Sequence, residues 1–447
     1  MNRKTVIFLF IIVLLHAFWF GAGMLWQHFY NGDSYEYIYL ADNIKQGHYY
    51  GANPLLPLND FRLTLRTPVY PLLLLLCYTL FGYTNWVILL LQNIFSIASC
   101  WLIRDTVLKI KPATDYTWLY TLFLAFYPAQ MFFATTLAPD TLLQFFLMLY
   151  CRQLVLSLQA KRGKHIAYMS LWLILATLTK PIVYPFLFLH LLYALWYCFR
   201  LRSPIPVATA ALPLLLMLGY GMWNKQRTGL FHISSIQSTN LLHYNVHYFL
   251  AWKYGPAYAD SLIRVKKAEQ NALPGLKQKY EYASREAGSI IKAHLAAYSI
   301  FHLKESARFF IEPGKSELDL YTGYLGYNFD PKAPNFYKSY RERGIAGAWD
   351  YLKTYPWLPL VLLIFLFNLL RVLGGILFFF QKKIPFPIRL CITGYILYFA
   401  AVTGPVANAR YFLPVLPILS GVAVLGYACW WDQRKSKKTE QAHASRA

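Results

Sequence analysis

The sequence predicts an all-α membrane protein that crosses the bilayer about ten times and carries one large polar region outside it. Of the 447 residues, 57% are hydrophobic and 14% are charged, whereas a soluble domain has about one quarter charged residues. The mean hydropathy is positive, at +0.34. Apolar runs long enough to cross a membrane recur along the chain. These observations exclude a soluble enzyme, a disordered chain and a coiled coil.

The predicted spans lie on separate apolar runs, and the first is too long and lacks the cleavage site of a signal peptide. The runs are 5–26, 85–103, 117–136, 139–157, 166–180, 181–199, 206–224, 355–379, 387–403 and 411–431. Segment 67–82 is also apolar, but as a helix it would reach only about 24 Å, short of the roughly 30 Å hydrocarbon core.

The distribution of basic residues indicates whether segment 67–82 crosses the membrane. If this segment does not span and the N-terminus is cytoplasmic, all the basic clusters between spans fall inside, as the positive-inside rule requires. Those clusters are Arg104/Lys109/Lys111, Lys161/Arg162/Lys164, Arg200/Arg202, Lys382/Lys383 and Arg434/Lys435/Lys437/Lys438. We therefore predict a short helix on the outer face of the membrane.

This topology divides the chain into four parts. Residues 1–224 form an N-terminal membrane module that contains the external loop 27–66 and the short juxtamembrane helix 67–82. Residues 225–354 form an external, mostly helical region, in which 276–312 has helical periodicity. The C-terminal membrane helices occupy 355–431, and a basic cytoplasmic tail occupies 432–447.

The net charge of +23 has two interpretations. In a soluble protein it would indicate nucleic acid, but here basic residues keep helix ends on the cytoplasmic side and contact anionic lipid. Membrane lipid, and not nucleic acid, is thus the expected partner; a phosphate-bearing ligand is the second interpretation. The six cysteines lie in or beside apolar runs, and no Asn-x-Ser/Thr sequon occurs, which favours a bacterial envelope.

Two aspartates stand at the predicted outer ends of spans, where ionisable side chains are candidates for function. Asp33 follows the first span, with Glu36 one helical turn further on, and Asp140 lies in a hairpin between two spans. A carboxylate here can take a proton from a hydroxyl or hold a divalent cation. The alternative for each aspartate is a helix N-cap or first-turn residue.

Three basic residues occupy the same predicted face: Arg66 before the short helix, Lys180 between two spans, and Arg410, followed by Tyr411, before the last span. Each suits contact with phosphate, and each has the alternative of an interfacial side chain that reaches for water. Acids that activate a nucleophile beside bases that stabilise a leaving phosphate fit transfer of a group from a lipid phosphate.

Other features are weaker. His243 and His247 are one helical turn apart, but no Glu follows the first His, so this is not the zinc-protease motif. Tyr321, Tyr324 and Tyr327 recur every third residue and suit either sugar stacking or an interfacial aromatic belt. No P-loop, GxGxxG or GxSxG motif occurs, which argues against nucleotide-driven pumps, dinucleotide enzymes and serine hydrolases.

Four stretches of the chain resemble the GT-C glycosyltransferases, which are membrane enzymes that use polyprenyl-phosphate sugars. The resemblance is strongest to the dolichyl-phosphate-mannose protein mannosyltransferase-like group, which includes bacterial aminoarabinose and lipopolysaccharide-core sugar transferases. It rests on GDSYEYIYLADNIKQGHYY at 32–50, RTPVYPLLLL at 66–75, LAPDTLLQFFLMLY at 137–150 with LATLTKP at 175–181, and ARYFLPVLPIL at 409–419.

The resemblance implies a GT-C-like helical bundle and direct displacement at the outer face of the inner membrane. Asp33 matches the family's candidate base and Asp140 a second acid near the same cavity, with Glu36 as a further candidate. Arg66, Lys180 and Arg410 match positions associated with the donor phosphate, and Tyr411 adjoins the last of them. The donor would be an undecaprenyl-phosphate type sugar, and the acceptor an envelope glycan, lipid or protein.

The sequence departs from the family in having Asp33-Ser34 where many relatives have Asp-Glu. A metal site is therefore left open: if Mg²⁺ or Mn²⁺ binds, Asp33 and Asp140 are its expected ligands, and no cofactor is otherwise expected. The alternative function is a secondary transporter of a lipid-linked or anionic solute, which would need polar residues near the bilayer midplane. The sugar, acceptor, linkage and oligomeric state stay open.

Overall fold

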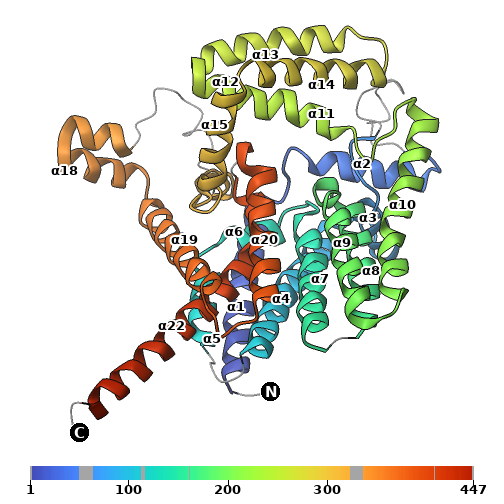
Figure 1. Ribbon diagram of the computed structural model, residues 1–447. Helices are drawn as coiled ribbons and strands as arrows, with labels where there is room; N and C mark the ends of the chain where they lie inside the picture. The colour runs from blue at the N-terminus through green and yellow to red at the C-terminus, as the bar shows by residue number, and fades with distance from the viewer. Residues whose placement is uncertain are drawn as a thin grey trace.

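The computed structural model describes residues 3–49, 64–111, 116–160, 162–322, 336–406 and 408–444, which form helices and their connections without any β-strand. The all-α membrane fold class is thus confirmed. Helices of the bundle run side by side, with both chain termini at one end of it (Figure 1). The bundle helices are α1 (Arg3–Trp26), α4 (Asn85–Ile110), α7 (Asp140–Ala160), α8 (Lys164–Thr179), α9 (Phe186–Leu201), α10 (Ile205–Thr228), α19 (Leu358–Phe379), α20 (Phe386–Thr403) and α22 (Leu416–Ala444).

Six helices among the described residues have the length and composition to cross a membrane: α1, α4, α7, α10, α19 and the stretch Phe386–Val406 that contains α20. The predicted spans 166–180 and 181–199 correspond to the shorter helices α8 and α9, of 16 residues each. Helix α22 does not end near residue 431 but continues to Ala444, through most of the predicted tail.

The predicted span 117–136 is not one helix, and this prediction is corrected. It forms α5 (Thr117–Ala125) and α6 (Ala129–Ala134), separated at Phe126–Pro128. Pro128 has no N–H and its ring crowds the preceding turn, which favours a break at this point. The guanidinium of the fully buried Arg371 donates to the freed carbonyls of Phe123 and Phe126.

The predicted short segment 67–82 forms the helix α3 (Val69–Phe81), of 13 residues. Just after its C-terminal end, the Tyr83 hydroxyl donates to Asp42 in α2 (Ser34–Lys45) over 2.6 Å. Asn85 then donates to the Tyr30 hydroxyl, just past the end of α1, over 2.6 Å. Because the chain enters and leaves α3 beside the same segment, this helix does not change sides.

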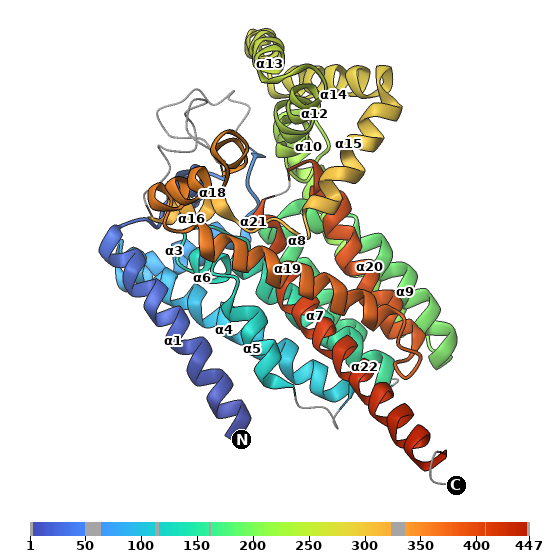
Figure 2. The ribbon, with the colours of Figure 1, turned by 90° about the vertical axis from the view of Figure 1, so that its left-hand side faces the viewer.

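The external region forms a helical layer over the end of the bundle that is opposite the termini (Figures 1 and 2). The layer has a small core of its own, separate from that of the bundle, in which Leu242, Val246, Phe249 and Phe301 are buried. The stretch 276–312, which was predicted to be helical, forms two helices. The layer contains α11 (Ile236–Asn240), the π-helical turn η3 (Leu241–Val246), α12 (His247–Tyr254), α13 (Pro256–Asn271), α14 (Leu276–Ala293) and α15 (Leu295–Arg308).

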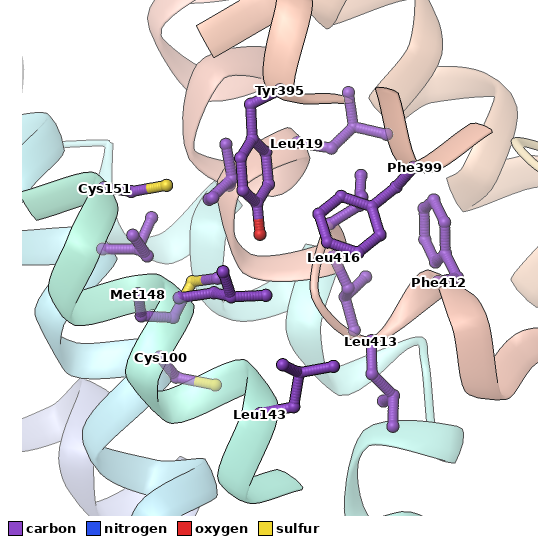
Figure 3. Packing of buried hydrophobic residues seen from close by; sticks show 14 of the residues in the cluster. Cys100, Leu143, Met148, Cys151, Tyr395, Phe399, Phe412, Leu413, Leu416 and Leu419 are labelled. Carbon is purple, nitrogen blue, oxygen red and sulfur yellow. The ribbon is translucent and has the colours of Figure 1, made fainter. Parts of the chain in front are cut away.

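The remaining elements are connections, either between the layer and the bundle or between helices of the bundle. Helices α4, α7, α20 and α22 pack through buried apolar side chains, several of which Figure 3 shows. All six cysteines are free, as expected of small hydrophobic side chains. The connecting elements are α16 (Lys315–Thr322), α18 (Phe336–Thr354), the short helices η2 (Pro181–Val183) and η4 (Gly404–Val406), and α21 (Ala409–Phe412).

Candidate active site

Backbone contacts bring the loops that carry the two aspartates together. The Leu137 amide donates to the Phe29 carbonyl over 2.8 Å, and the buried Ser34 hydroxyl donates to the Leu137 carbonyl over 2.7 Å. The loop after α1 is therefore paired with the loop before α7. This pairing places Asp33 beside Asp140, although 107 positions separate them in the sequence.

The charged side chains form one chain of alternating ion pairs, which we call the floor network. Its members are Glu36, Arg66, Asp33, Arg410, Asp140 and Lys180, in that order. Arg66 bonds to Glu36 and to Asp33, at 2.8 Å in each case. Arg410 joins Asp33 at 2.5 Å to Asp140 at 2.7 Å, and Lys180 lies 2.7 Å from the other oxygen of Asp140. Three acids thus meet three bases.

Two aromatic rings complete this cluster. The Arg66 guanidinium lies 4.9 Å from the ring centre of Tyr37, and the Lys180 ammonium lies 4.8 Å from that of Tyr411. All seven side chains that the sequence nominated are therefore together. Tyr37 was missed, although its position four residues after Asp33, one helical turn along α2, is a signal that the sequence contains.

The alternative roles considered for the two aspartates hold as positions, because Asp33 is the N-cap residue of α2 and Asp140 is the first residue of α7. These positions do not account for the contacts of their side chains. The Asp33 side chain makes no N-cap hydrogen bond to α2, and the Asp140 carboxylate is 3% exposed and faces two cations. The basic side chains are also largely buried, with 7% of Arg66 and 16% of Arg410 exposed. They point toward the carboxylates, whereas interfacial side chains would reach for bulk water.

The electrostatics of the floor network keep Asp33 ionised. Burial alone would raise the pKa of the Asp33 carboxyl, but the charges of Arg410 and Arg66 outweigh burial and hold this pKa well below its ordinary value. Burial raises the pKa of Tyr37 to about 12, so its hydroxyl stays neutral. In this state Asp33 is a carboxylate with both oxygens engaged, and therefore a weak base.

A cavity of about 1030 Å³ opens above the floor network. Asp33, Glu36, Arg66, Lys180 and Arg410 line its lower side, and side chains from the helical layer line its upper side. Segment 232–235 joins the two sides, because the Ser235 amide donates to the Thr64 carbonyl over 3.1 Å, two residues before Arg66. Two reactants can therefore meet between the bundle and the layer.

The floor network does not suit a divalent cation. Both oxygens of Asp33 and both oxygens of Asp140 already bond to basic side chains, and three positive charges surround the place that a cation would take. Across the described ranges, no group of three or more His, Cys, Asp or Glu residues is arranged to hold a metal. A metal ligand role for Asp33 and Asp140 therefore gains no support from this geometry.

The weaker sequence candidates have other partners. His243 bonds to Gln270 at 2.9 Å and His247 to Asp260 at 2.8 Å, so the two imidazoles do not form a metal pair. Tyr321 is buried against Trp19 and Phe132 and does not offer its ring to a sugar. Tyr324 and Tyr327 lie outside the described residues.

A buried chain of hydrogen bonds below the floor network was not predicted. The Gln130 and Gln144 amides bond to each other at 2.7 and 2.8 Å, and Gln130 also donates to Ser96, which contacts His16 at 2.8 Å. Gln144, one turn below Asp140, donates to the Leu413 carbonyl at 2.6 Å, three residues beyond Arg410. This chain fixes the helices that carry Asp140 and Arg410 relative to each other.

Comparison with known proteins gives two findings and one absence. The fold is similar to crystal structures of ArnT from Cupriavidus metallidurans, bound to undecaprenyl phosphate (12% identity, TM-score 0.40, 95% of this chain and 78% of that chain) and in the apo state (12%, 0.36, 94% and 77%). No curated protein matches the sequence. Residues 65–223 match the dolichyl-phosphate-mannose-protein mannosyltransferase family, so the predicted resemblance to the GT-C glycosyltransferases is confirmed over this part of the chain.

Proposed function

We propose that the protein is an integral-membrane glycosyltransferase that takes a sugar from a polyprenyl-phosphate donor, of the undecaprenyl type, at the outer face of the inner membrane. The acceptor is an envelope glycan, lipid or protein. The observation that carries the proposal is the floor network, in which three acids alternate with three bases beneath an open cavity. The matched family, which is named for a lipid-phosphate-linked mannose donor, supports the same class of reaction.

The proposed reaction is a single displacement. The acceptor hydroxyl oxygen attacks the anomeric carbon of the donor sugar, and the bond from this carbon to the phosphate oxygen breaks. The bonding electrons leave with polyprenyl phosphate, and the hydroxyl proton passes to the Asp33 carboxylate. Arg66, Lys180 and Arg410 stabilise the charge on the leaving phosphate. The energy comes from the donor ester, so the reaction needs no nucleotide.

The donor phosphate also solves the difficulty that Asp33 is a weak base at rest. A phosphate is a stronger competitor than a carboxylate for planar guanidinium donors. When it binds to Arg410 and Arg66, the two charges that depress the pKa of Asp33 turn toward the phosphate. The pKa of Asp33 then rises, and the carboxylate becomes a better base once the donor is in place.

Asp140 has a different role in this proposal. Its carboxylate is more deeply buried than that of Asp33 and bonds to Lys180 and Arg410. It holds two of the phosphate-binding cations on the floor of the cavity, and it does not face the acceptor. Glu36 acts in the same way on Arg66.

The decisive experiment measures donor turnover by the purified protein in detergent. A panel of radiolabelled polyprenyl-phosphate sugars is supplied with and without membrane extract, and released polyprenyl phosphate is counted. We expect turnover with one class of donor and a loss of about 10²–10⁴-fold in Asp33→Asn. Size-exclusion profiles and melting temperatures check that this variant folds.

Two results would contradict the proposal. Normal turnover by Asp33→Asn would exclude Asp33 as the base. Failure of the folded wild-type protein to use any donor would favour the transporter alternative, which uptake of a labelled lipid-linked solute into proteoliposomes would then test.

A further inference from the structure

The cavity has two sides of different chemistry. Its lower side is the floor network, whose three positive and three negative charges cancel. Its upper side, which we call the roof, consists of the lining residues of α11, η3, α12, α13 and α14. Figure 1 shows these helices stacked above the end of the bundle.

The roof carries two lysines that make no ion pair with any residue that the structure describes. Lys267 of α13 and Lys279 of α14 line the cavity, and neither makes an ion pair in the part of the chain that the structure describes. No Asp or Glu side chain of the layer is among the lining residues. Asp140 does not line the cavity but balances one cation of the floor network from beneath it. The floor network and the roof together therefore carry an excess of two positive charges, both from the roof lysines.

The other roof side chains suit a sugar. Tyr244 and Tyr248, one helical turn apart, are 46% and 40% exposed and line the cavity, so each can pack against the apolar face of a pyranose ring. Gln237, Asn240 and Asn245 add amides, which both donate to and accept from hydroxyl groups.

His243 completes this set of neutral groups. Burial, assisted by the charge of Lys267, lowers the pKa of His243 to about 4, so the imidazole is neutral near pH 7. Its Nε2 bonds to the side-chain oxygen of Gln270, which requires a donor. The other ring nitrogen, Nδ1, is then an acceptor for a sugar hydroxyl.

We propose that the roof binds the acceptor, and that this acceptor is a saccharide bearing an anionic group, a phosphate or a carboxylate, held by Lys267 and Lys279. This inference rests on the proposed function, because the floor network takes the donor. The volume of about 1030 Å³ lies at the upper end of the range of about 300–1000 Å³ that pockets for small ligands cover, so a sugar on the roof has room beside a donor phosphate on the floor. An acceptor held by the roof would present its hydroxyl downward, toward Asp33.

The test is a binding measurement that does not need donor turnover. Soluble saccharides are released from the cell envelope with mild acid and divided into untreated, dephosphorylated and carboxyl-reduced portions. Stabilisation of the detergent-solubilised protein against heat is then measured over a range of saccharide concentrations. We expect the untreated portion to bind, and one of the two treated portions to bind on the order of tenfold more weakly, because a charge-assisted hydrogen bond is lost. The treatment that weakens binding identifies the anionic group. This group is a phosphate if dephosphorylation weakens binding, and a carboxylate if carboxyl reduction does.

Two double variants locate the binding site. Lys267→Gln/Lys279→Gln removes both roof charges, and we expect it to bind the untreated portion as weakly as wild type binds the affected treated one. Arg264→Gln/Lys292→Gln removes the same charge from exposed positions of α13 and α14 that do not line the cavity, and should bind like wild type. The melting temperature without saccharide checks that each variant is folded.

Each contrary result overturns the inference in a distinct way. Equal binding of all three portions would show that charge is not recognised, as expected if the acceptor is a protein. Charge-dependent binding that survives in Lys267→Gln/Lys279→Gln would place the anion on the floor network. If none of the three portions binds, the roof is not a saccharide-binding site. The proposed function fails separately, if donor turnover does not need Asp33.

Discussion

The floor and the roof of the cavity are built on opposite principles. On the floor, each charged side chain has an oppositely charged partner within 2.8 Å, and the side chains are mostly buried. On the roof, Lys267 and Lys279 line the cavity without an ion pair among the described residues. The floor lies on the densely packed bundle, and the roof lies on a layer with a small separate core.

Because of this difference, the floor and the roof would bind a ligand in different ways. A ligand of the floor must replace an existing carboxylate on Arg410 or Arg66, so binding there rearranges the protein. A ligand of the roof meets lysines that have no ion pair among the described residues, so binding there breaks none of the ion pairs described. The floor therefore suits an event that must switch on a base, and the roof suits recognition.

The largest effect on stability is expected from removing the central cation of the floor. Arg410→Met leaves Asp33 and Asp140 each without one partner, and breaking a buried pair in this way costs about 3–5 kcal/mol. Thermal unfolding in detergent measures the loss. Adding Asp140→Asn should restore part of it, because the uncompensated charge disappears. If Arg410→Met alone is as stable as wild type, the charged side chains of the floor network are not tightly coupled.

A smaller loss is expected from the hydrogen-bond chain under the floor. Gln144→Leu removes the donor to the Gln130 side-chain oxygen and to the Leu413 carbonyl, while the Gln130 amide keeps its bond to Ser96. The expected cost is about 1–3 kcal/mol. Because Leu413 follows Arg410 closely, KM for the donor should also rise. Gln159→Leu, at the exposed far end of the same helix, is the matched control. Equal KM values for the two variants would show that the hydrogen-bond chain does not affect how the floor network binds the donor.

The pH dependence of the Asp33 contribution should be flat near neutrality. Its folded-state pKa lies below the ordinary value, so its stabilising ion pairs are fully present above the unfolded pKa and are lost only as pH falls through the folded pKa. The melting temperatures of wild type and Asp33→Asn should therefore differ by the same amount at about pH 5 and about pH 8. A difference that shrinks at the lower pH would mean that Asp33 takes up its proton near neutrality.

The smallest effect is expected from removing divalent cations. The carboxylates of the floor bond to Arg and Lys, and we propose that the reaction uses these cations in place of a metal. Donor turnover should be unchanged after EDTA treatment and unaffected by added Mg²⁺ or Mn²⁺. Activity that disappears with EDTA and returns with either ion would show that a metal displaces the basic side chains.

The same comparison explains what could be predicted from the sequence. Asp33, Asp140, Lys180 and Arg410 stood out because charged residues are rare and costly next to apolar spans. Lys267 and Lys279 belong to helices with many charges, so nothing in the sequence distinguishes them from ordinary surface lysines. Their position over the cavity depends on how the layer packs, which local patterns do not encode.

The fold shows the same division between local and non-local information. Apolar runs predicted where most bundle helices lie, because length and hydrophobicity are local properties. The break between α5 and α6 was missed, although Pro128 is visible in the sequence, since a proline inside a membrane helix is tolerated where neighbours satisfy the freed carbonyls. Here the break persists beside Arg371, 243 positions away, and such a partner is not apparent from sequence spacing.

The separate core of the helical layer has a consequence for local unfolding. A segment with its own small core opens as a cooperative unit at a lower free energy than the whole domain. Backbone amides of α13 and α14 should therefore exchange with deuterated solvent faster than those of α7 and α4. During each such opening the upper wall of the cavity is lost while the ion pairs below it persist. The proposed donor site would then stay complete throughout, and the proposed acceptor site would assemble intermittently.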